Sequence, residues 1–211
     1  MYSKFCLLLA LSAATQAVDA SAQTLPAGAS DNGEWIELQG SGMAGAQHVV
    51  VSARVSGCGI RTGLAECNLT ALRVEVGGTP VPVVGAQGRI TYVVPGGGYS
   101  AGASLPLAVR DINADGHPDL QVWQTSNGNY NAPVHAFYLF NAQMERFERA
   151  PALEAAIGGR EIDEIADGRV TLWARPSPCE REEKQVHVRG NEVTTVFQRR
   201  YDTCKGNAPP E

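Results

Sequence analysis

Residues 105–123, LPLAVRDINADGHPDLQVW, place a run of polar residues between two apolar runs. The flanking runs LPLAV and LQVW are short and rich in branched or large apolar side chains, as strands packed on a core are. Two such runs joined by a short polar connection predict a β-hairpin. The hairpin indicates an antiparallel sheet at the centre of the chain.

The polar connection, residues 111–119, has the spacing of a calcium loop on this hairpin. Gly116 at its sixth position permits a sharp turn, and oxygen ligands on alternate residues can converge on one cation because the loop curls around it. Val122 stands where an EF-hand has its bidentate glutamate, and the flanks are strands. We therefore predict one Ca²⁺, held by the side chains or, for the histidine, the backbone carbonyl of Asp111, Asn113, Asp115, His117 and Asp119.

The alternative for this loop is an Asx-rich turn that holds no ion. If calcium binds, a structural role is favoured over a catalytic one, because a loop that wraps its ion leaves few positions for substrate. A partial copy, residues 163–168, has Ile165 where the first copy has Asn113. We interpret it as a plain Asp-Gly hairpin turn.

Strand-like segments with breaks rich in glycine extend over most of the chain. Only residues 151–159 look helical, with Pro151 in the first turn and Gly158 at the end. The expected fold is mostly β, a single domain that is a sandwich or a strongly curved antiparallel sheet with one short helix. The expected strands are residues 35–39, 48–55, 69–76, 89–94, 105–111, 120–124, 135–140, 169–175, 184–189 and 193–200.

The N-terminus predicts an exported protein. Residues 1–22 combine a lysine, a short apolar run and small residues at Ala20 and Ala22, as a cleavable signal peptide does. We divide the rest into a leader (23–33), a β-rich domain (34–205) with the calcium hairpin at 105–125, and a tail (206–211). The net charge of −5 argues against nucleic acid as a partner, and no membrane anchor is predicted.

Four cysteines remain after the signal, and an even number in an exported chain indicates disulfides. Zinc is the competing interpretation, but neither C-x-x-C-like spacings nor clustered histidines occur. Of the three possible connectivities we choose local pairing. If Gly190 and Asn191 form a hairpin tip, the last two cysteines fall nearly opposite each other. The predicted bridges are Cys58 with Cys67 and Cys179 with Cys204.

Residues typical of catalysis are not grouped in the sequence. No histidine has a partner at metal-ligand spacing, and neither G-x-S-x-G nor H-E-x-x-H occurs. The carboxylates of EWIE (34–37) and CEREE (179–183) are interpreted as surface charge. We therefore expect a protein that is not an enzyme, although a carboxylate pair formed only in the folded state stays open.

A second polar loop follows the calcium hairpin. It carries one aromatic residue among small polar ones, as protein-recognition loops do, and the alternative is a tyrosine folded back onto its own sheet. The candidate partner-binding residues are Ser126, Asn127, Gly128, Asn129 and Tyr130. The aromatic residues of the neighbouring strands, Trp123, Phe137, Tyr138 and Phe140, are expected in the core.

The order of these features resembles a known family. An export signal, VRDINADGHPDL (109–120), the Gly/Asn/Tyr loop, YLFN (138–141) and MERF (144–147) resemble the calcium-binding periplasmic immunity proteins against lysozyme-like effectors of an interbacterial type IV secretion system. Those proteins are similar in fold to the periplasmic inhibitors of invertebrate-type lysozyme. The resemblance is best over residues 105–147. This chain departs from it in having Asn127 between Ser126 and Gly128, and in lacking a lipoprotein cysteine.

The resemblance implies a periplasmic inhibitor whose loop enters the cleft of a lysozyme-like hydrolase. Tyr130 would then reach the catalytic carboxylate, with Ser126, Gly128 and Asn129 shaping the tip. The alternative function is a calcium-dependent envelope adhesion or assembly module without an enzyme target.

Overall fold

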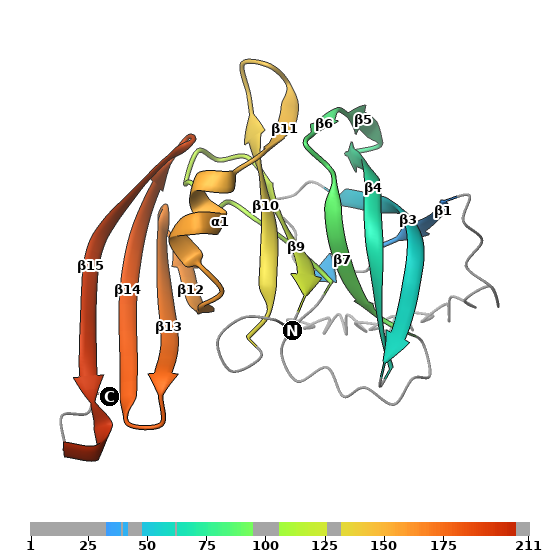
Figure 1. Ribbon diagram of the computed structural model, residues 1–211. Helices are drawn as coiled ribbons and strands as arrows, with labels where there is room; N and C mark the ends of the chain where they lie inside the picture. The colour runs from blue at the N-terminus through green and yellow to red at the C-terminus, as the bar shows by residue number, and fades with distance from the viewer. Residues whose placement is uncertain are drawn as a thin grey trace, which may run out of the picture.

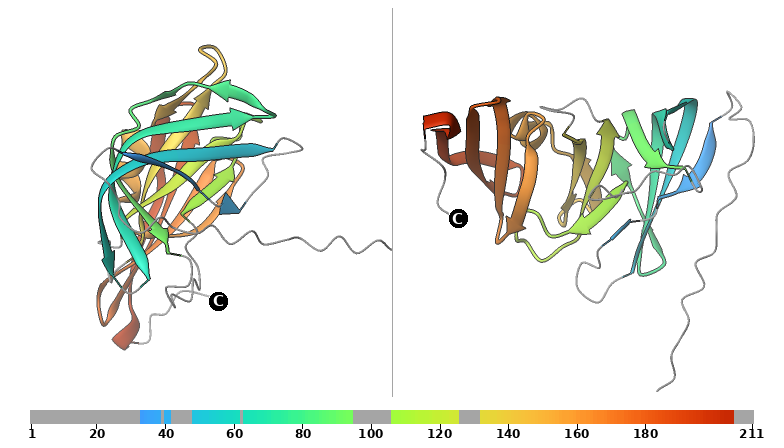
Figure 2. Two further views of the ribbon diagram at one scale, coloured as in Figure 1. Left: turned by 90° about the vertical axis from the view of Figure 1, so that its right-hand side faces the viewer. Right: turned by 90° about the horizontal axis from the view of Figure 1, so that it is seen from below.

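Three β-sheets lie one behind the other, and the middle sheet is covered on both faces (Figure 1, Figure 2). The computed structural model describes residues 33–38, 40–41, 48–61, 63–94, 106–125 and 132–205. The predicted signal peptide and most of the leader lie outside these residues. No helix in the described part of the chain is long and apolar enough to span a membrane.

The first sheet is built on a long hairpin whose second strand pairs along both edges. One edge of β4 pairs with β3, and its other edge pairs with β7 through residues 64–69 and with β5 through residues 74–76. This sheet contains β1 (Glu34–Glu37), β3 (Val49–Arg61), β4 (Leu64–Val76), β5 (Thr79–Val81) and β7 (Gly88–Val93).

The central sheet has the order β2-β8-β9-β10-β11-β6 and contains the predicted calcium hairpin, β8 and β9. Its inner pairs are antiparallel, whereas the short outer pairs β2–β8 and β11–β6 are parallel. Its strands are β2 (Gly40–Ser41), β6 (Val83–Val84), β8 (Leu107–Arg110), β9 (Asp119–Thr125), β10 (Val134–Asn141) and β11 (Arg146–Arg149).

The C-terminal sheet is an antiparallel meander that follows the one α-helix of the described residues, α1 (Pro151–Ile157). Proline at the start of α1 needs no helical N–H partner, and Gly158 ends the helix with a φ of 57°. The sheet contains β12 (Glu161–Ala166), β13 (Arg169–Ser177), β14 (Glu180–Arg189) and β15 (Glu192–Asp202), and a 3₁₀ turn follows at Thr203–Lys205.

Strand β10 explains why the central sheet is buried on both sides. Its alternate residues face opposite layers: Ala136 and Tyr138 pack with the first sheet. Phe137 and Leu139 pack with α1 and the C-terminal sheet. Each large apolar side chain buried this way contributes roughly 1.5–3 kcal/mol. The unbroken apolar run in the sequence is therefore a strand between two cores.

The fold predictions are confirmed at the level of class and of local pairing. The chain is mostly β with a short helix, and the bridges Cys58–Cys67 and Cys179–Cys204 are both formed. β14 and β15 turn at Gly190 and Asn191, as predicted. Of the four aromatic residues expected in the core, Trp123, Phe137 and Tyr138 are fully buried and Phe140 is partly buried.

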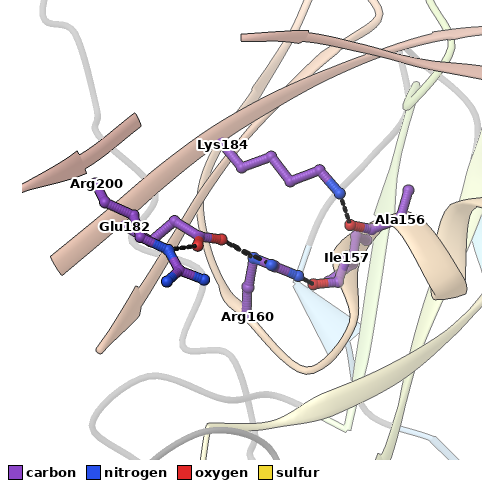
Figure 3. Close-up of polar contacts among 6 residues, drawn as sticks. All are labelled: Ala156, Ile157, Arg160, Glu182, Lys184 and Arg200. Atoms are coloured by element: carbon purple, nitrogen blue, oxygen red, sulfur yellow. Dashed lines mark hydrogen bonds and ion pairs between the residues drawn. The ribbon is translucent and has the colours of Figure 1, made fainter. Parts of the chain in front are cut away.

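One interpretation of surface charge is wrong. Glu182, in the CEREE run, has a side chain that is only 2% exposed and lies between α1 and the C-terminal sheet (Figure 3). Arg160 and Arg200 donate hydrogen bonds to its two carboxylate oxygens, at 2.7 Å and 2.9 Å. A buried carboxylate is tolerated when it is paired in this way. The pairing is invisible in the sequence because its members are far apart along the chain.

Candidate calcium loop and inhibitory loop

The predicted calcium loop joins β8 to β9 at one end of the central sheet. The hairpin register places Arg110 opposite Asp119, so the loop begins and ends on neighbouring strands. Asp119 is the first residue of β9 and is fully buried, and Asn113 is also buried. Asp111 is partly buried and Asp115 is exposed. The loop therefore has an inner wall and an open outer side.

Asp119 ties the loop to the rest of the central sheet. Its Oδ2 accepts a hydrogen bond from the backbone N–H of Ile112 at 2.8 Å, and its Oδ1 accepts one from Phe140 in β10 at 2.8 Å. Burial raises the pKa of this carboxyl to about 7. The two N–H groups oppose the rise, and the charges of Asp115 and Asp111 add to it. A cation beside this carboxylate would remove that conflict.

The outer carboxylates curl the chain around the loop's interior. Asp111 accepts hydrogen bonds from the backbone N–H groups of Asp115 at 3.1 Å and Gly116 at 2.9 Å. The Asp115 carboxylate accepts the N–H of His117 at 2.9 Å and the side-chain amide of Asn113 at 2.9 Å. Gly116 has a φ of 85°, which agrees with the sharp turn predicted at that position.

The donor set of this loop suits calcium more than a transition metal. Every predicted ligand supplies oxygen, which Ca²⁺ prefers, and the His117 ring packs on Phe140 with the ring centroids 5.1 Å apart. No group of three or more His, Cys, Asp or Glu side chains is gathered for a metal ion within the described ranges. The donor chemistry and the buried Asp119 carboxylate fit an ion, and Ca²⁺ binding stays a prediction.

The calcium loop also contacts the C-terminal sheet. The turn between β12 and β13 consists of Asp167 and Gly168, both with positive φ, as a type I′ hairpin turn requires. These two residues end the partial copy at residues 163–168, so the predicted Asp-Gly turn is confirmed, whereas residues 163–166 belong to β12. A Cβ on Gly168 would lie 2.9 Å from the carbonyl oxygen of Val188 and 3.2 Å from that of Asn113. The loop therefore sits where two sheets meet.

The predicted inhibitory loop follows the last residue of β9, Thr125, in the sequence. Its residues Ser126, Asn127, Gly128, Asn129 and Tyr130 fall outside the residues that the structure describes. Its base is described: Thr125 pairs with Val134, and the register shifts between Val134 and His135. A strand buried in the middle of three layers thus connects the calcium loop to the base of the second loop.

Two residues that the sequence analysis did not single out for function brace this base. Thr91 of β7 donates a side-chain hydrogen bond to the carbonyl oxygen of Gln124 at 2.8 Å, which joins the first sheet to β9. Trp123 donates its ring N–H to the carbonyl oxygen of Thr125 at 3.1 Å. The threonine lies about 30 residues upstream in the sequence, and no local pattern connects it with the loop.

No protein-family model and no curated protein matches the chain. A solved structure, described as a Xanthomonas type IV secretion system related protein, matches with a TM-score of 0.60 and 19% sequence identity. The match covers 82% of this chain and 91% of that chain, so the two proteins are similar in fold over most of their lengths.

Proposed function

We propose that the protein is a periplasmic, calcium-stabilised inhibitor of a lysozyme-like peptidoglycan hydrolase, acting as an immunity protein associated with a type IV secretion system. The observation that carries the proposal is the joint order of features: an acidic loop, a buried strand and a polar loop with one tyrosine. The similarity in fold to a type IV secretion system related protein of Xanthomonas supports the same association. The two disulfides fit an oxidising compartment.

The buried strand β9 suits a loop that must bind without rearrangement. Its first five residues, from Asp119 to Trp123, are all buried, and hydrogen bonds to β7 and β10 hold its two ends. Ordering a flexible side chain at an interface costs about 0.5–1.5 kcal/mol, so a fixed loop base saves part of that free energy. A calcium ion between Asp111 and Asp119 would fix the other end of the same strand. In this proposal the ion has no part in chemistry.

A lysis assay tests the proposal. Purified protein is added to lysozyme-like hydrolases of several types acting on peptidoglycan, and the fall in turbidity is followed. We expect the wild-type protein to slow lysis by at least one of them, and Tyr130→Ala to lose most of that inhibition while its melting temperature is unchanged. A failure of the wild-type protein against every hydrolase would favour the adhesion or assembly module instead.

The matched control is Met144→Ala. Met144 is 56% exposed in the turn between β10 and β11, which lies at the other end of β10 from the 126–131 loop. The substitution removes a similar apolar contact area but leaves the predicted contact surface intact. Inhibition should therefore be retained, and equal loss in both variants would contradict the assignment of the loop.

A further inference from the structure

The C-terminal sheet has one face that no described helix or strand covers (Figure 2). Its inner face packs on α1 through Val170, Leu172, Val186 and Val188. Because side chains alternate along a strand, the residues between these point away from the molecule. We call this second surface the outer face.

One side of the outer face is acidic. In β12, Glu161 pairs with Trp173 and Glu164 pairs with Thr171, so both glutamates share the face of that tryptophan. Asp163 joins them, since its carboxylate accepts the ring N–H of Trp173 at 3.2 Å. All three carboxylates are exposed, and none forms an ion pair within the described residues. We call Glu161, Asp163 and Glu164 the acidic strip.

The other side of the same face carries arginines that lie on aromatic rings. The guanidinium of Arg181 in β14 is 4.0 Å from the centre of the Trp173 ring, and that of Arg199 in β15 is 5.0 Å from the centre of the Tyr201 ring. Arg175 in β13 is exposed beside them. Cation–π contacts hold a guanidinium in place and leave its N–H groups available for hydrogen bonds.

These arginines, Arg175, Arg181 and Arg199, form the arginine patch. None forms an ion pair in the part of the chain that is described. The carboxylate of Glu183, which pairs with Arg199 across the strands on this face, instead accepts the Tyr201 hydroxyl at 2.9 Å. Beside the patch Phe197 is 39% exposed and Val196 is 52% exposed. Arginine with exposed aromatic and apolar side chains is typical of the centre of protein interfaces.

We propose that two copies of this protein associate through their outer faces, related by a two-fold axis parallel to the strands. Such an axis places β12 of each copy over β15 of the other, so that each acidic strip meets the partner's arginine patch. The face is therefore complementary in charge to itself, which a symmetric dimer interface requires. A partner whose surface carried only one charge sign would be attracted by one half of the outer face and repelled by the other half.

The extent of the outer face is adequate for such a dimer. The four strands have 6, 9, 10 and 11 residues. At about 3.3 Å per residue and about 4.8 Å between strands they cover roughly 570 Å² in projection. This is of the order of the ~800 Å² that each partner buries in a stable interface. The exposed side chain of Phe197, which pairs with Gln185 on this face, would be covered in the same step.

Charge reversal with cross-rescue tests the proposal by sedimentation velocity at about 0.05 M salt, where exposed charges are weakly screened. We expect the wild-type protein to be a dimer that dissociates as salt rises. The acidic-strip variant Glu161→Arg/Glu164→Arg, which keeps Asp163, and the arginine-patch variant Arg181→Glu/Arg199→Glu, which keeps Arg175, should each be monomeric. An equimolar mixture of the two should form a heterodimer, which no defect in folding can imitate.

The matched control is Arg61→Glu/Arg73→Glu on the first sheet. It changes the charge equally and also removes a guanidinium from a tryptophan, since Arg73 lies 4.6 Å from the Trp35 ring. This variant should stay dimeric. Should a reversed variant fail to fold, the milder Glu161→Gln/Glu164→Gln is expected to weaken the dimer about tenfold, as the loss of four exposed ion pairs would. A monomeric wild type, a dimer that survives both reversals, or folded variants that do not pair overturns the proposal.

Discussion

The buried carboxylate of Glu182 gives a stability prediction whose size follows from the structure. Glu182→Gln removes the charge that neutralises Arg160, while the shape of the side chain is kept (Figure 3). Breaking a fully buried ion pair costs about 3–5 kcal/mol. The Arg160 and Arg200 side chains are 21% and 64% exposed, so water can partly replace the lost partner. We therefore expect a loss of about 2–3 kcal/mol.

The network also connects α1 to the C-terminal sheet, so breaking it should destabilise the helix and the sheet together. Arg160 donates to the carbonyl oxygen of Ile157 at 3.1 Å, and Lys184 donates to that of Ala156 at 2.6 Å. These cations lie where the helix dipole leaves partial negative charge at the C-terminus of α1. In a protein of this size the expected loss lowers the melting temperature by roughly 5–10 °C. Circular dichroism during thermal and urea unfolding measures both quantities.

The pH dependence gives this prediction a second readout. Burial raises the pKa of Glu182, but hydrogen bonds from Arg160 and Arg200 lower it more, and the net pKa lies below its ordinary value. A carboxyl whose pKa is lower in the folded state stabilises the fold above its unfolded pKa, about 4.3, and loses that effect as the pH falls. The difference between wild type and Glu182→Gln should therefore shrink below about pH 4.

Arg200→Ala is the matched control for this prediction. Its guanidinium is largely in water, so its loss should cost at most about 1 kcal/mol. If Glu182→Gln were no more destabilising than Arg200→Ala, or if its effect were the same at pH 3 and pH 7, the buried network would not stabilise the protein as described.

Three further predictions concern the loop and the core. Removal of calcium with a chelator should lower the melting temperature. Calcium at about 100 times its dissociation constant should then restore about 2.7 kcal/mol of unfolding free energy, which corresponds to roughly 5–10 °C. Identical melting curves with and without the chelator would count against an ion site. Gly168→Ala should lower the free energy of unfolding, measured in urea, by more than about 1 kcal/mol. Residue 168 has a positive φ, and the new Cβ would lie 2.9 Å from the Val188 carbonyl oxygen. An unaffected variant would show that this contact can relax. Burial, and then the charge of Arg110, lowers the pKa of His135 to about 4. At residue 135 only the unfolded state then gains a proton between about pH 6.5 and pH 4. The stability of the wild type relative to His135→Gln should therefore fall by up to about 1.4 kcal/mol per pH unit in that range, and a constant difference between the two would contradict the assignment.

The sequence predicted those parts of the fold that depend on neighbouring residues. Alternating patterns located most strands, although β3 and β4 extend further than predicted because their pairing continues through bulges. Pro151 and Gly158 marked the helix within two residues. The position of Gly190 and Asn191 at a turn was enough to pair Cys179 with Cys204, because a hairpin fixes its own register.

The arrangement of the sheets could not be predicted in the same way. β10 contributes to two cores because α1 and β12–β15 pack over the central sheet. The residues of β10 do not by themselves predict that packing. Glu182 was expected at the surface for the same reason, since its partners Arg160 and Arg200 come from other elements. Residues 111–119 form one connection between β8 and β9, as the hairpin prediction requires, and their role as calcium ligands stays a prediction. The bracing residue Thr91 was missed because it belongs to another sheet.

We propose that the 126–131 loop occupies the substrate cleft of a lysozyme-like hydrolase, and the inhibitory function depends on this contact. The most direct measurement is calorimetric titration of the protein into an inhibited hydrolase, with and without a saturating oligosaccharide substrate analogue in the cleft. We expect tight binding to the free enzyme, which the oligosaccharide abolishes and which Tyr130→Ala weakens strongly. Binding that is unchanged by the oligosaccharide, and equal for wild type and Tyr130→Ala, would contradict it.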